Sequence, residues 1–417
     1  MKNIPIIGYK SFIFSSAVVF SLRYSNILGT FARQYQAMKF KDIAGHSEVA
    51  AALREVADSS KIPHAILLSG ISGIGKMRLA RAFAQYVHCR NHVNGDSCGV
   101  CPSCLQHQNF NNPDIHFVYP VVKKEGALVS TDFIDEWKEM LSDWSYMPPE
   151  KWNELINAGN SQPAIFVNES EEIIAKASLS AFQENFKIFL IWLPEKMRPE
   201  AANKLLKIIE EPFEDTIFIL VSNDDSKVLP TIYSRAQRFN LRPLSQEDIS
   251  KHLSTNFGID PTTATAASRI SEGSIGKAEE LACHPDEILE FSSIFKETMR
   301  MAYGLRTQRL KQLSETCAAM GREKLLRFLS YAGRMVRENF IYNMKMPQIS
   351  LLTPEEEEFS HRFSPFIHEG NVEGLASEIS RASGDIERNA NAKIVMFDLM
   401  LLLSQWVRTP KPATLPI

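Results

Sequence analysis

Short hydrophobic runs alternate with amphipathic stretches through the first part of the chain. Short apolar runs bounded by turn residues are typical of strands buried in a parallel sheet. Such runs occur at 64–69, 115–119, 188–193 and 217–221. Helical spacing occurs between them, at 48–57, 77–88 and 200–211, where Pro212 stops the last helix. Strands that alternate with helices predict an α/β fold, a parallel sheet with helices on both faces.

A polar stretch at 123–160 interrupts this pattern. It carries three tryptophans, Trp137, Trp144 and Trp152, and we predict that it is helical. From Leu241 onward the strand signal ends. Ser245 looks like the start of a helix, and 264–281 predicts a small helical lid.

The remainder of the chain reads as helix. Apolar residues recur at helical spacing in two segments. The first set is Leu325, Phe328, Leu329, Ala332, Met335 and Val336, and the second is Ile394, Phe397 and Leu401. A run of acidic residues, Glu355 to Glu358, is interpreted as the solvated start of a helix. The final residues, 409–417, contain three prolines and predict a loose tail.

The composition is that of an ordinary globular protein, with 44% hydrophobic and 23% charged residues. The 46 basic and 49 acidic residues give a net charge of -3, which argues against a surface devoted to nucleic acid but allows a local basic patch. The apolar segment 11–22 is too short to span a bilayer. It resembles the apolar part of a signal peptide, but no cleavage site leads into a secreted-looking domain. We therefore expect 1–37 to be a disordered extension or the result of a start codon assigned too early, before a domain that begins at Met38, with a targeting segment as the alternative.

Residues Gly70 to Lys76 fit the phosphate-binding pattern G-x-x-x-x-G-K between a strand and a helix. Gly70, Gly73 and Gly75 would let backbone N–H groups turn toward phosphate oxygens, and Lys76 would neutralise the outer phosphates. However, Met77 stands where a hydroxyl should bind Mg²⁺, and a thioether is a poor ligand for a hard cation. The pattern predicts a vestigial phosphate loop; a glycine turn without any ligand is the alternative.

The predicted strand at 188–193 also lacks residues that ATP hydrolysis requires. It should end in an acidic pair that holds Mg²⁺ and activates water, but these places are Trp192 and Leu193. Glu195 lies beyond the strand end. Without the metal ligands and the base, ATP hydrolysis is not expected. ATP binding should be absent or weak, and the sequence leaves open whether the loop holds a nucleotide without metal.

Clustered cysteines give the sharpest signal, in the pattern C-x8-C-x2-C-x2-C. The predicted metal ligands are Cys89, Cys98, Cys101 and Cys104. Gly95, Gly99 and Pro102 would supply the turns that bring four thiolates round one tetrahedral Zn²⁺, and four thiolates leave no open position, so the zinc would be structural. Free loop cysteines are the alternative. A zinc-dependent nucleic-acid binder is disfavoured, because few basic or aromatic residues flank the cluster. Cys283 and Cys317 are interpreted as core residues.

The order of motifs resembles the bacterial clamp-loader ATPase family, the γ/τ and δ′ subunits of DNA polymerase III. The resemblance rests on several segments, namely FKDIAG at 40–45, HAILLSG at 64–70, the four-cysteine insert, ANKLLKIIEEP at 202–212 and LPTIYSRA at 229–236. They lie between 38 and 240, and the C-terminal third matches only in being helical. The resemblance implies an AAA+ P-loop domain over 38–240 with a zinc module at 89–104. A lid at 241–284 and an all-α collar for oligomerisation at 285–408 would follow.

The resemblance also implies roles for particular residues. The arginine of the family's S-R-C box acts on a neighbouring subunit's ATP, and it maps to Arg235, although Ala236 replaces the cysteine. The alternative is an arginine paired to an acidic neighbour on a loop. The family's lid motif G-S-x-R appears as 273–276, but its arginine is missing and Lys277 comes one place late.

Three lapsed nucleotide-handling positions beside a surviving trans-acting arginine resemble δ′ rather than γ/τ. The implied function is a non-catalytic cytoplasmic subunit that assembles with γ/τ and δ-type subunits and helps to load the sliding clamp onto primed DNA. The alternative is an ATP-hydrolysing γ/τ-like subunit.

Overall fold

The computed structural model describes residues 39–411, apart from 60, 125–128, 144–145, 160, 184, 214, 284 and 347–349. The predicted extension 1–37, the start at Met38, Trp144 and the last part of the predicted tail lie outside the described residues. The chain divides into two compact units. The first runs to Ser268 and includes Glu272–Ala278, and the second comprises Arg269–Ser271 and the chain from Glu279 onward. No described helix is both long enough and apolar enough to cross a membrane.

A five-stranded parallel sheet forms the centre of the first unit, in the order β2-β3-β4-β1-β5. The strands are β1 (Ala65–Ser69), β2 (Ile115–Val118), β3 (Lys187–Trp192), β4 (Thr216–Ser222) and β5 (Gln237–Asn240). The first four confirm the predicted strands. β5 was not predicted, because it lies at the sheet edge with mostly exposed side chains and therefore lacks the apolar run of a central strand.

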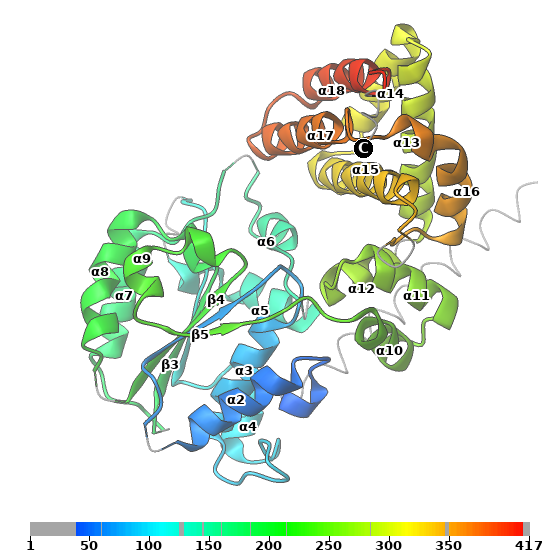
Figure 1. The fold of residues 1–417 in the computed structure, drawn as a ribbon. Helices are drawn as coiled ribbons and strands as arrows, with labels where there is room; N and C mark the ends of the chain where they lie inside the picture. The colour runs from blue at the N-terminus through cyan, green and yellow to red at the C-terminus, as the bar shows by residue number, and fades with distance from the viewer. Residues whose placement is uncertain are drawn as a thin grey trace, which may run out of the picture. The chain divides into compact units, whose positions relative to one another are not determined.

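Helices cover both faces of this sheet, as predicted (Figure 1). One face carries α2 (Ser47–Asp58), α3 (Lys76–His88), α5 (Ile134–Asp143) and α6 (Pro149–Leu155). The other face carries α7 (Val167–Ala177), α8 (Pro199–Glu210) and α9 (Pro230–Tyr233). Alternate residues of β3 explain the two layers: Leu190 joins the first core and Phe189 the second. The described part of the 123–160 stretch is helical, and Trp137 and Trp152 are buried in the first core.

Smaller helices complete the first unit. The cysteine-rich segment ends in α4 (Pro102–Gln108), and the region after β5 contains α10 (Gln246–Phe257) and α11 (Pro261–Ile270). The Ser245 hydroxyl accepts a hydrogen bond from the backbone N–H of Asp248 at 3.1 Å, which confirms the predicted helix start. α12 (Ile275–Cys283) begins in the first unit and ends in the second.

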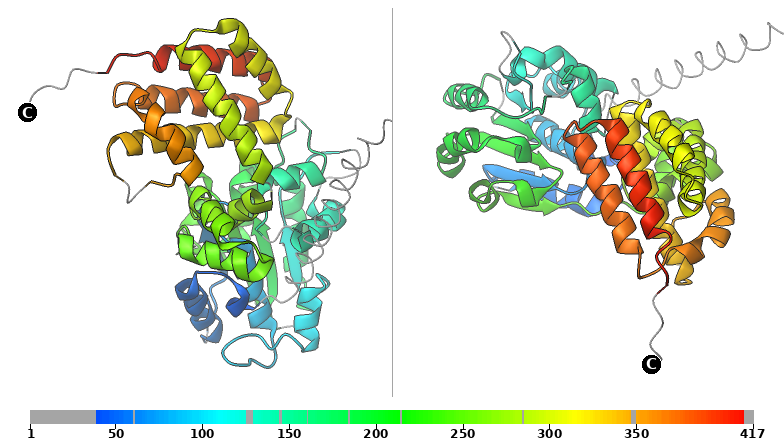
Figure 2. Two further views of the ribbon diagram at one scale, coloured as in Figure 1. Left: turned by 90° about the vertical axis from the view of Figure 1, so that its right-hand side faces the viewer. Right: turned by 90° about the horizontal axis from the view of Figure 1, so that it is seen from above.

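The second unit consists of helices joined by turns and loops, with no strand among its described residues, and is shown in yellow to red in Figure 2. Its main helices are α13 (Pro285–Tyr303), α14 (Thr307–Ala318), α15 (Arg322–Asn343), α16 (Pro354–Phe363), α17 (Val372–Glu387) and α18 (Ala392–Trp406). The predicted apolar stripe of α15 is buried, and Cys317 is fully buried as predicted. The side chain of Cys283 lies outside the described residues.

The acidic run of α16 corrects one prediction. Glu356 is only 3% exposed and forms a buried ion pair with Arg334, so the interpretation of the whole run as solvated is wrong at this residue. Its carboxylate also accepts a hydrogen bond from the backbone N–H of Thr353 at 3.0 Å, and the Thr353 hydroxyl accepts one from the N–H of Glu356. This reciprocal capping turns one glutamate inward, while Glu355, Glu357 and Glu358 remain exposed.

The apolar residues singled out on α18 lie on its less buried face. Ile394 is 69% exposed, whereas the helix buries Met396, Leu399, Met400 and Leu403. The helix itself is as predicted. Because α18 is apolar on nearly every side, spacing alone did not identify which face packs inward.

Candidate functional sites

The phosphate loop has the predicted strand–loop–helix context between β1 and α3. Gly70, Gly73 and Gly75 have φ values of 146°, 76° and 96°, a region that L side chains rarely adopt. The ammonium of Lys76 donates to the carbonyl oxygens of Gly70, at 2.7 Å, and Ile71. Burial lowers the pKa of Lys76 to about 7, although the charge of Glu195 raises it. The lysine therefore binds the carbonyls of its own loop.

The segment 273–276 packs directly on this loop. The backbone N–H of Gly276 donates to the carbonyl of Gly73 at 3.0 Å, and a Cβ on Gly73 would lie 2.3 Å from the Ser274 hydroxyl. Tyr146 lies against the same place, because a Cβ on Gly276 would be 2.9 Å from the Tyr146 Cβ. These contacts occupy the space beside the loop glycines with protein atoms.

The three positions at which catalysis needs polar groups are all buried in the first core. Met77, Trp192 and Leu193 are 4%, 2% and 4% exposed. The Trp192 ring centroid lies 5.4 Å from that of Trp137 and 6.4 Å from that of Trp152. An indole in this aromatic cluster offers no lone pair to Mg²⁺. Met77, Trp192 and Leu193, which together with the phosphate loop we call the phosphate-loop corner, therefore provide no metal ligand.

Glu195 lies beyond the end of β3, as its position in the sequence predicts. It sits in a short 3-10 turn (Pro194–Lys196) that follows Leu193, whose backbone is left-handed with φ 55°. Its carboxylate accepts hydrogen bonds from the Ser222 hydroxyl at 2.8 Å and from the backbone N–H of Asn223 at 2.9 Å. The side chain therefore links the ends of β3 and β4.

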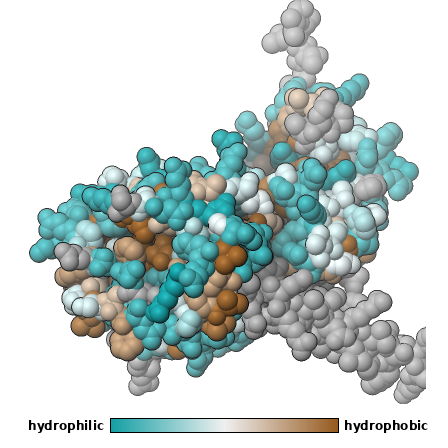
Figure 3. Space-filling model, turned by 90° about the horizontal axis from the view of Figure 1, so that it is seen from below, coloured by the Kyte–Doolittle hydropathy of each residue, from teal (hydrophilic) through white to brown (hydrophobic). Residues whose placement is uncertain are grey.

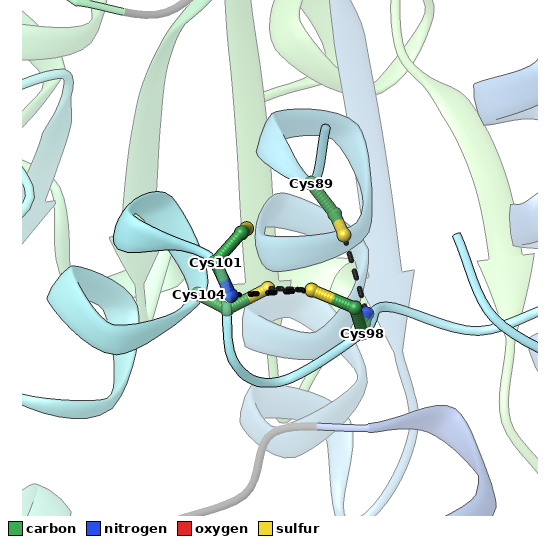
Figure 4. A group of neighbouring side chains, drawn as sticks. All are labelled: Cys89, Cys98, Cys101 and Cys104. Atoms are coloured by element: carbon green, nitrogen blue, oxygen red, sulfur yellow. Dashed lines mark hydrogen bonds between the residues drawn. The ribbon is translucent and has the colours of Figure 1, made fainter. Parts of the chain in front are cut away.

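The four clustered cysteines come together as the spacing predicts. Their sulfur atoms lie within 4.8 Å of one another and face a common space (Figure 4). Gly95 and Gly99, with φ 71° and 78°, form the turns between them, and Pro102 begins α4. The sulfur atoms of Cys98 and Cys104 are 3.9 Å apart. All four are free thiols, and this group could hold a metal ion.

Backbone N–H groups point at two of these sulfur atoms. The N–H of Cys98 donates to Cys89 Sγ at 3.2 Å, and the N–H groups of Val100 and Cys101 donate to Cys98 Sγ at 3.5 and 3.3 Å. Burial raises the pKa of the Cys98 thiol, but hydrogen bonds from the backbone N–H groups of Val100 and Cys101 and with the Cys101 and Cys89 side chains lower it to about 6. Such donors stabilise a thiolate, which is the form that binds metal.

One of the sulfur–sulfur distances is compatible with Zn²⁺. A tetrahedral site with Zn–S distances of about 2.3 Å has sulfur atoms about 3.8 Å apart, close to the 3.9 Å between Cys98 and Cys104. The ligands would be Cys89, Cys98, Cys101 and Cys104, and the ion would supply a cross-link.

The cysteine segment is also fastened to the rest of the first unit. The Asp96 carboxylate accepts hydrogen bonds from the backbone N–H groups of Phe40 at 3.3 Å and Lys41 at 3.1 Å. Lys39 Nζ donates to the carbonyl of Cys98 at 3.0 Å. The segment therefore holds down the described start of the chain, a role that the sequence did not reveal because these partners are more than fifty positions apart.

Arg235 lies just after α9 on the surface. Its guanidinium forms an ion pair with Glu210, the last residue of α8, at 2.5 Å, and donates to the carbonyl of Thr231 at 2.7 Å. This is the arrangement of the alternative interpretation, an arginine paired with an acidic neighbour. Exposed pairs of this kind contribute only about 0–1 kcal/mol, so the arginine is also easily released toward another anion.

The fold and the loop together define the class: an AAA+ P-loop domain with a five-stranded parallel sheet, followed by a mostly helical region. Residues 45–245, a little under half of the chain, match the family described as DNA polymerase III, delta subunit. The relatives below are similar to this chain over a little more than half of its length.

Curated relatives carry the names of one subunit type. The chain is 26% identical to DNA polymerase III subunit tau/gamma of Haemophilus influenzae, over 58% of this chain and 30% of the relative. It is 28% identical to DNA polymerase III subunit gamma of Buchnera aphidicola, over 53% of this chain and 50% of the relative. The chain thus spans half or less of these relatives. Among solved structures, a DNA polymerase III gamma subunit-related protein of Thermotoga maritima aligns at 14% identity and a TM-score of 0.41, over 86% of this chain and 99% of that one.

Proposed function

We propose that this chain is a non-catalytic, δ′-like subunit of the DNA polymerase III clamp loader. It would assemble in the cytoplasm with γ/τ and δ-type subunits and help to place the sliding clamp on primed DNA. The observation that carries the proposal is the burial of Met77, Trp192 and Leu193 in one apolar core, because this core leaves neither a Mg²⁺ ligand nor a base at these positions.

In this proposal Arg235 serves a neighbouring subunit's nucleotide. An arginine can stabilise charge on a transferred phosphoryl group without binding a nucleotide of its own chain. Its exposed position and its weak, replaceable pairing with Glu210 support this role, since docking of a neighbour would need to exchange one anion for another. The cysteine module would hold one structural Zn²⁺ and take no part in the chemistry.

An ATP-hydrolysing γ/τ-like subunit is the second candidate. The names of the matched relatives favour it, as do the phosphate-loop backbone and the presence of Lys76. The two candidates differ in what the chain does alone, because a γ/τ-like subunit would carry its own Mg²⁺ ligands and catalytic base.

A direct test is ATPase activity of the purified full chain, followed by identification of the proteins that purify with it. We expect background hydrolysis and a complex that contains γ/τ-type and δ-type subunits. Turnover by the isolated chain at a rate typical of AAA+ proteins would favour the γ/τ-like alternative. A complex without other loader subunits would remove the clamp-loader proposal.

A further inference from the structure

A pocket on the first unit carries a charge that nothing balances. It lies among α3, α4, β2 and α7, has a volume of about 110 Å³, and is floored by apolar side chains that include Phe117 and Leu190. One ordered water needs about 10–15 Å³ of such volume, so the pocket has room for several waters or one small ion. Arg81 of α3 lines it.

Arg81 is 6% exposed and pairs with no described acidic residue. Its one described interaction is with the ring of Phe110, whose centroid lies 4.5 Å from the guanidinium carbon. Burial lowers the pKa of Arg81 to about 9, with a smaller effect of the Arg78 charge, so the group remains cationic at neutral pH. A buried charge without a partner is strongly unfavourable, which makes this arginine unusual.

The other groups of the pocket that could carry a positive charge are either paired or neutral. Lys176 forms an ion pair with Glu172, and the Thr131 hydroxyl donates to the same carboxylate at 3.1 Å. His107 Nε2 is hydrogen-bonded to His88 Nδ1 at 3.0 Å. His116 is neutral, because burial lowers its pKa to about 4. Arg81 is therefore the one unneutralised cation among the residues that line the pocket.

We infer that this pocket is a binding site for a small oxyanion, held by the guanidinium of Arg81. The planar fork of N–H donors matches two oxygens of a phosphate or a carboxylate, while Phe110 stacks against the face of the guanidinium and leaves those edge donors to a ligand. A bound anion would join α3 of the sheet domain to α4, which carries Cys104, and would remove the cost of the buried charge. The inference stands apart from the clamp-loader proposal, because it uses none of the nucleotide-handling residues.

The test is urea unfolding of the metal-loaded full chain in sodium phosphate, sodium acetate or sodium chloride at matched ionic strength. Urea is required because guanidinium would compete with Arg81. At an anion concentration of 100 times Kd, the folded-to-unfolded ratio should rise about 100-fold over chloride. A response to phosphate only would identify a phosphoryl ligand, and a response to acetate would identify a carboxylate.

Two variants assign the response. Arg81→Met should abolish it and should be no less stable than the wild type in chloride, since it removes an unpaired buried charge. Lys76→Met, a matched change in the phosphate loop, should retain the response. If Arg81→Met does not fold, Arg81→Lys is the substitute, because it keeps the charge but removes the planar fork of donors. Equilibrium dialysis with labelled phosphate or acetate should then show at least tenfold weaker binding to Arg81→Lys than to the wild type.

Three results would overturn the inference. They are a wild type that responds to neither anion, an Arg81→Met variant that responds fully, and a response that disappears with Lys76→Met, which would place the anion in the phosphate loop instead.

Discussion

The cysteine module and the phosphate-loop corner are two potential metal sites on one domain, and they differ in whether the metal ligands are present. In the module, all four thiol ligands are present and converge within 4.8 Å. In the corner, the positions that should hold Mg²⁺ and activate water are filled by Met77, Trp192 and Leu193, which pack in the core. The glycines and Lys76 keep the loop's shape. The module therefore has all four candidate metal ligands in place, whereas the phosphate-loop corner keeps its glycines and Lys76 but has apolar side chains at the three other positions.

The position where an acidic residue is expected is part of the core. Trp192 belongs to a cluster with Trp137 and Trp152, so this position lies in a packed aromatic layer. The same domain retains an exposed arginine, Arg235, whose proposed role lies outside its own corner. Exposed hydrophobic side chains also interrupt the surface of the first unit, as the brown patches in Figure 3 show; Val100 and Phe182 are 75% and 78% exposed.

The largest effect is expected in the cysteine module. Cys101→Ser should release the metal, so that metal analysis falls from about one zinc per chain to none. Structural zinc contributes about 10–16 kcal/mol in small peptides that bind it, and we expect a loss of several kcal/mol in the unfolding free energy here. Cys317→Ser, a change at a buried cysteine outside the module, should leave the zinc in place. A fully folded wild type without metal would contradict the structural role.

Arg235→Ala tests the arginine that is proposed to act on a neighbouring subunit's nucleotide. The chain should fold, retain its zinc and assemble, because an exposed ion pair contributes little to stability. Hydrolysis at the adjoining subunit's site should fall by about 10³–10⁵, since a trans-acting arginine is worth that much in related enzymes.

The measurement is ATPase and clamp loading by a loader reconstituted with this variant, with Arg238→Ala as the matched control. Arg238 is an exposed arginine on β5 that lies over the Tyr233 ring. In a ring with several working sites the total ATPase should fall only in part. Wild-type rates for both activities in the Arg235→Ala loader would reduce Arg235 to a surface arginine.

Trp192→Ala should show that the corner is now part of the core. Removing the indole leaves a cavity beside Trp137 and Trp152, and a loss of about 3–5 kcal/mol is expected from comparable large-to-small changes. Urea unfolding measures the loss, and Trp192→Phe should lose less because it keeps an aromatic ring. If Trp192→Ala were as stable as the wild type, the indole would not be a packing element.

The smallest effect is expected from Met77→Thr. It restores the hydroxyl that could bind Mg²⁺, but Trp192 and Leu193 still exclude the acidic pair, so the ATPase activity of the isolated chain should stay at background. A rate typical of AAA+ proteins in this single variant would mean that the corner is nearly functional, and the contrast with the cysteine module would disappear.

Local patterns were sufficient for much of this protein. The three central strands, β1, β3 and β4, are buried on both faces, so their apolar runs are continuous and visible in the sequence. The glycine loop and the cysteine spacing are likewise short-range signals, because all of their residues lie within a few turns of one another along the chain. The substitutions at Met77, Trp192 and Leu193 were also apparent from position alone.

What only the tertiary structure decided depends on partners that are distant in the sequence. β5 is a strand because it pairs with β1, although its own residues carry no strand pattern. Arg334 turns Glu356 inward from a run that looks solvated, and Glu210 meets Arg235 across two elements. Arg81 is an ordinary helix residue in the sequence, and only the packing of α4 and β2 around it leaves its charge buried without a partner. The sequence determines which side chains are charged, but the tertiary packing around each of them determines whether its charge is solvated, paired or buried without a partner.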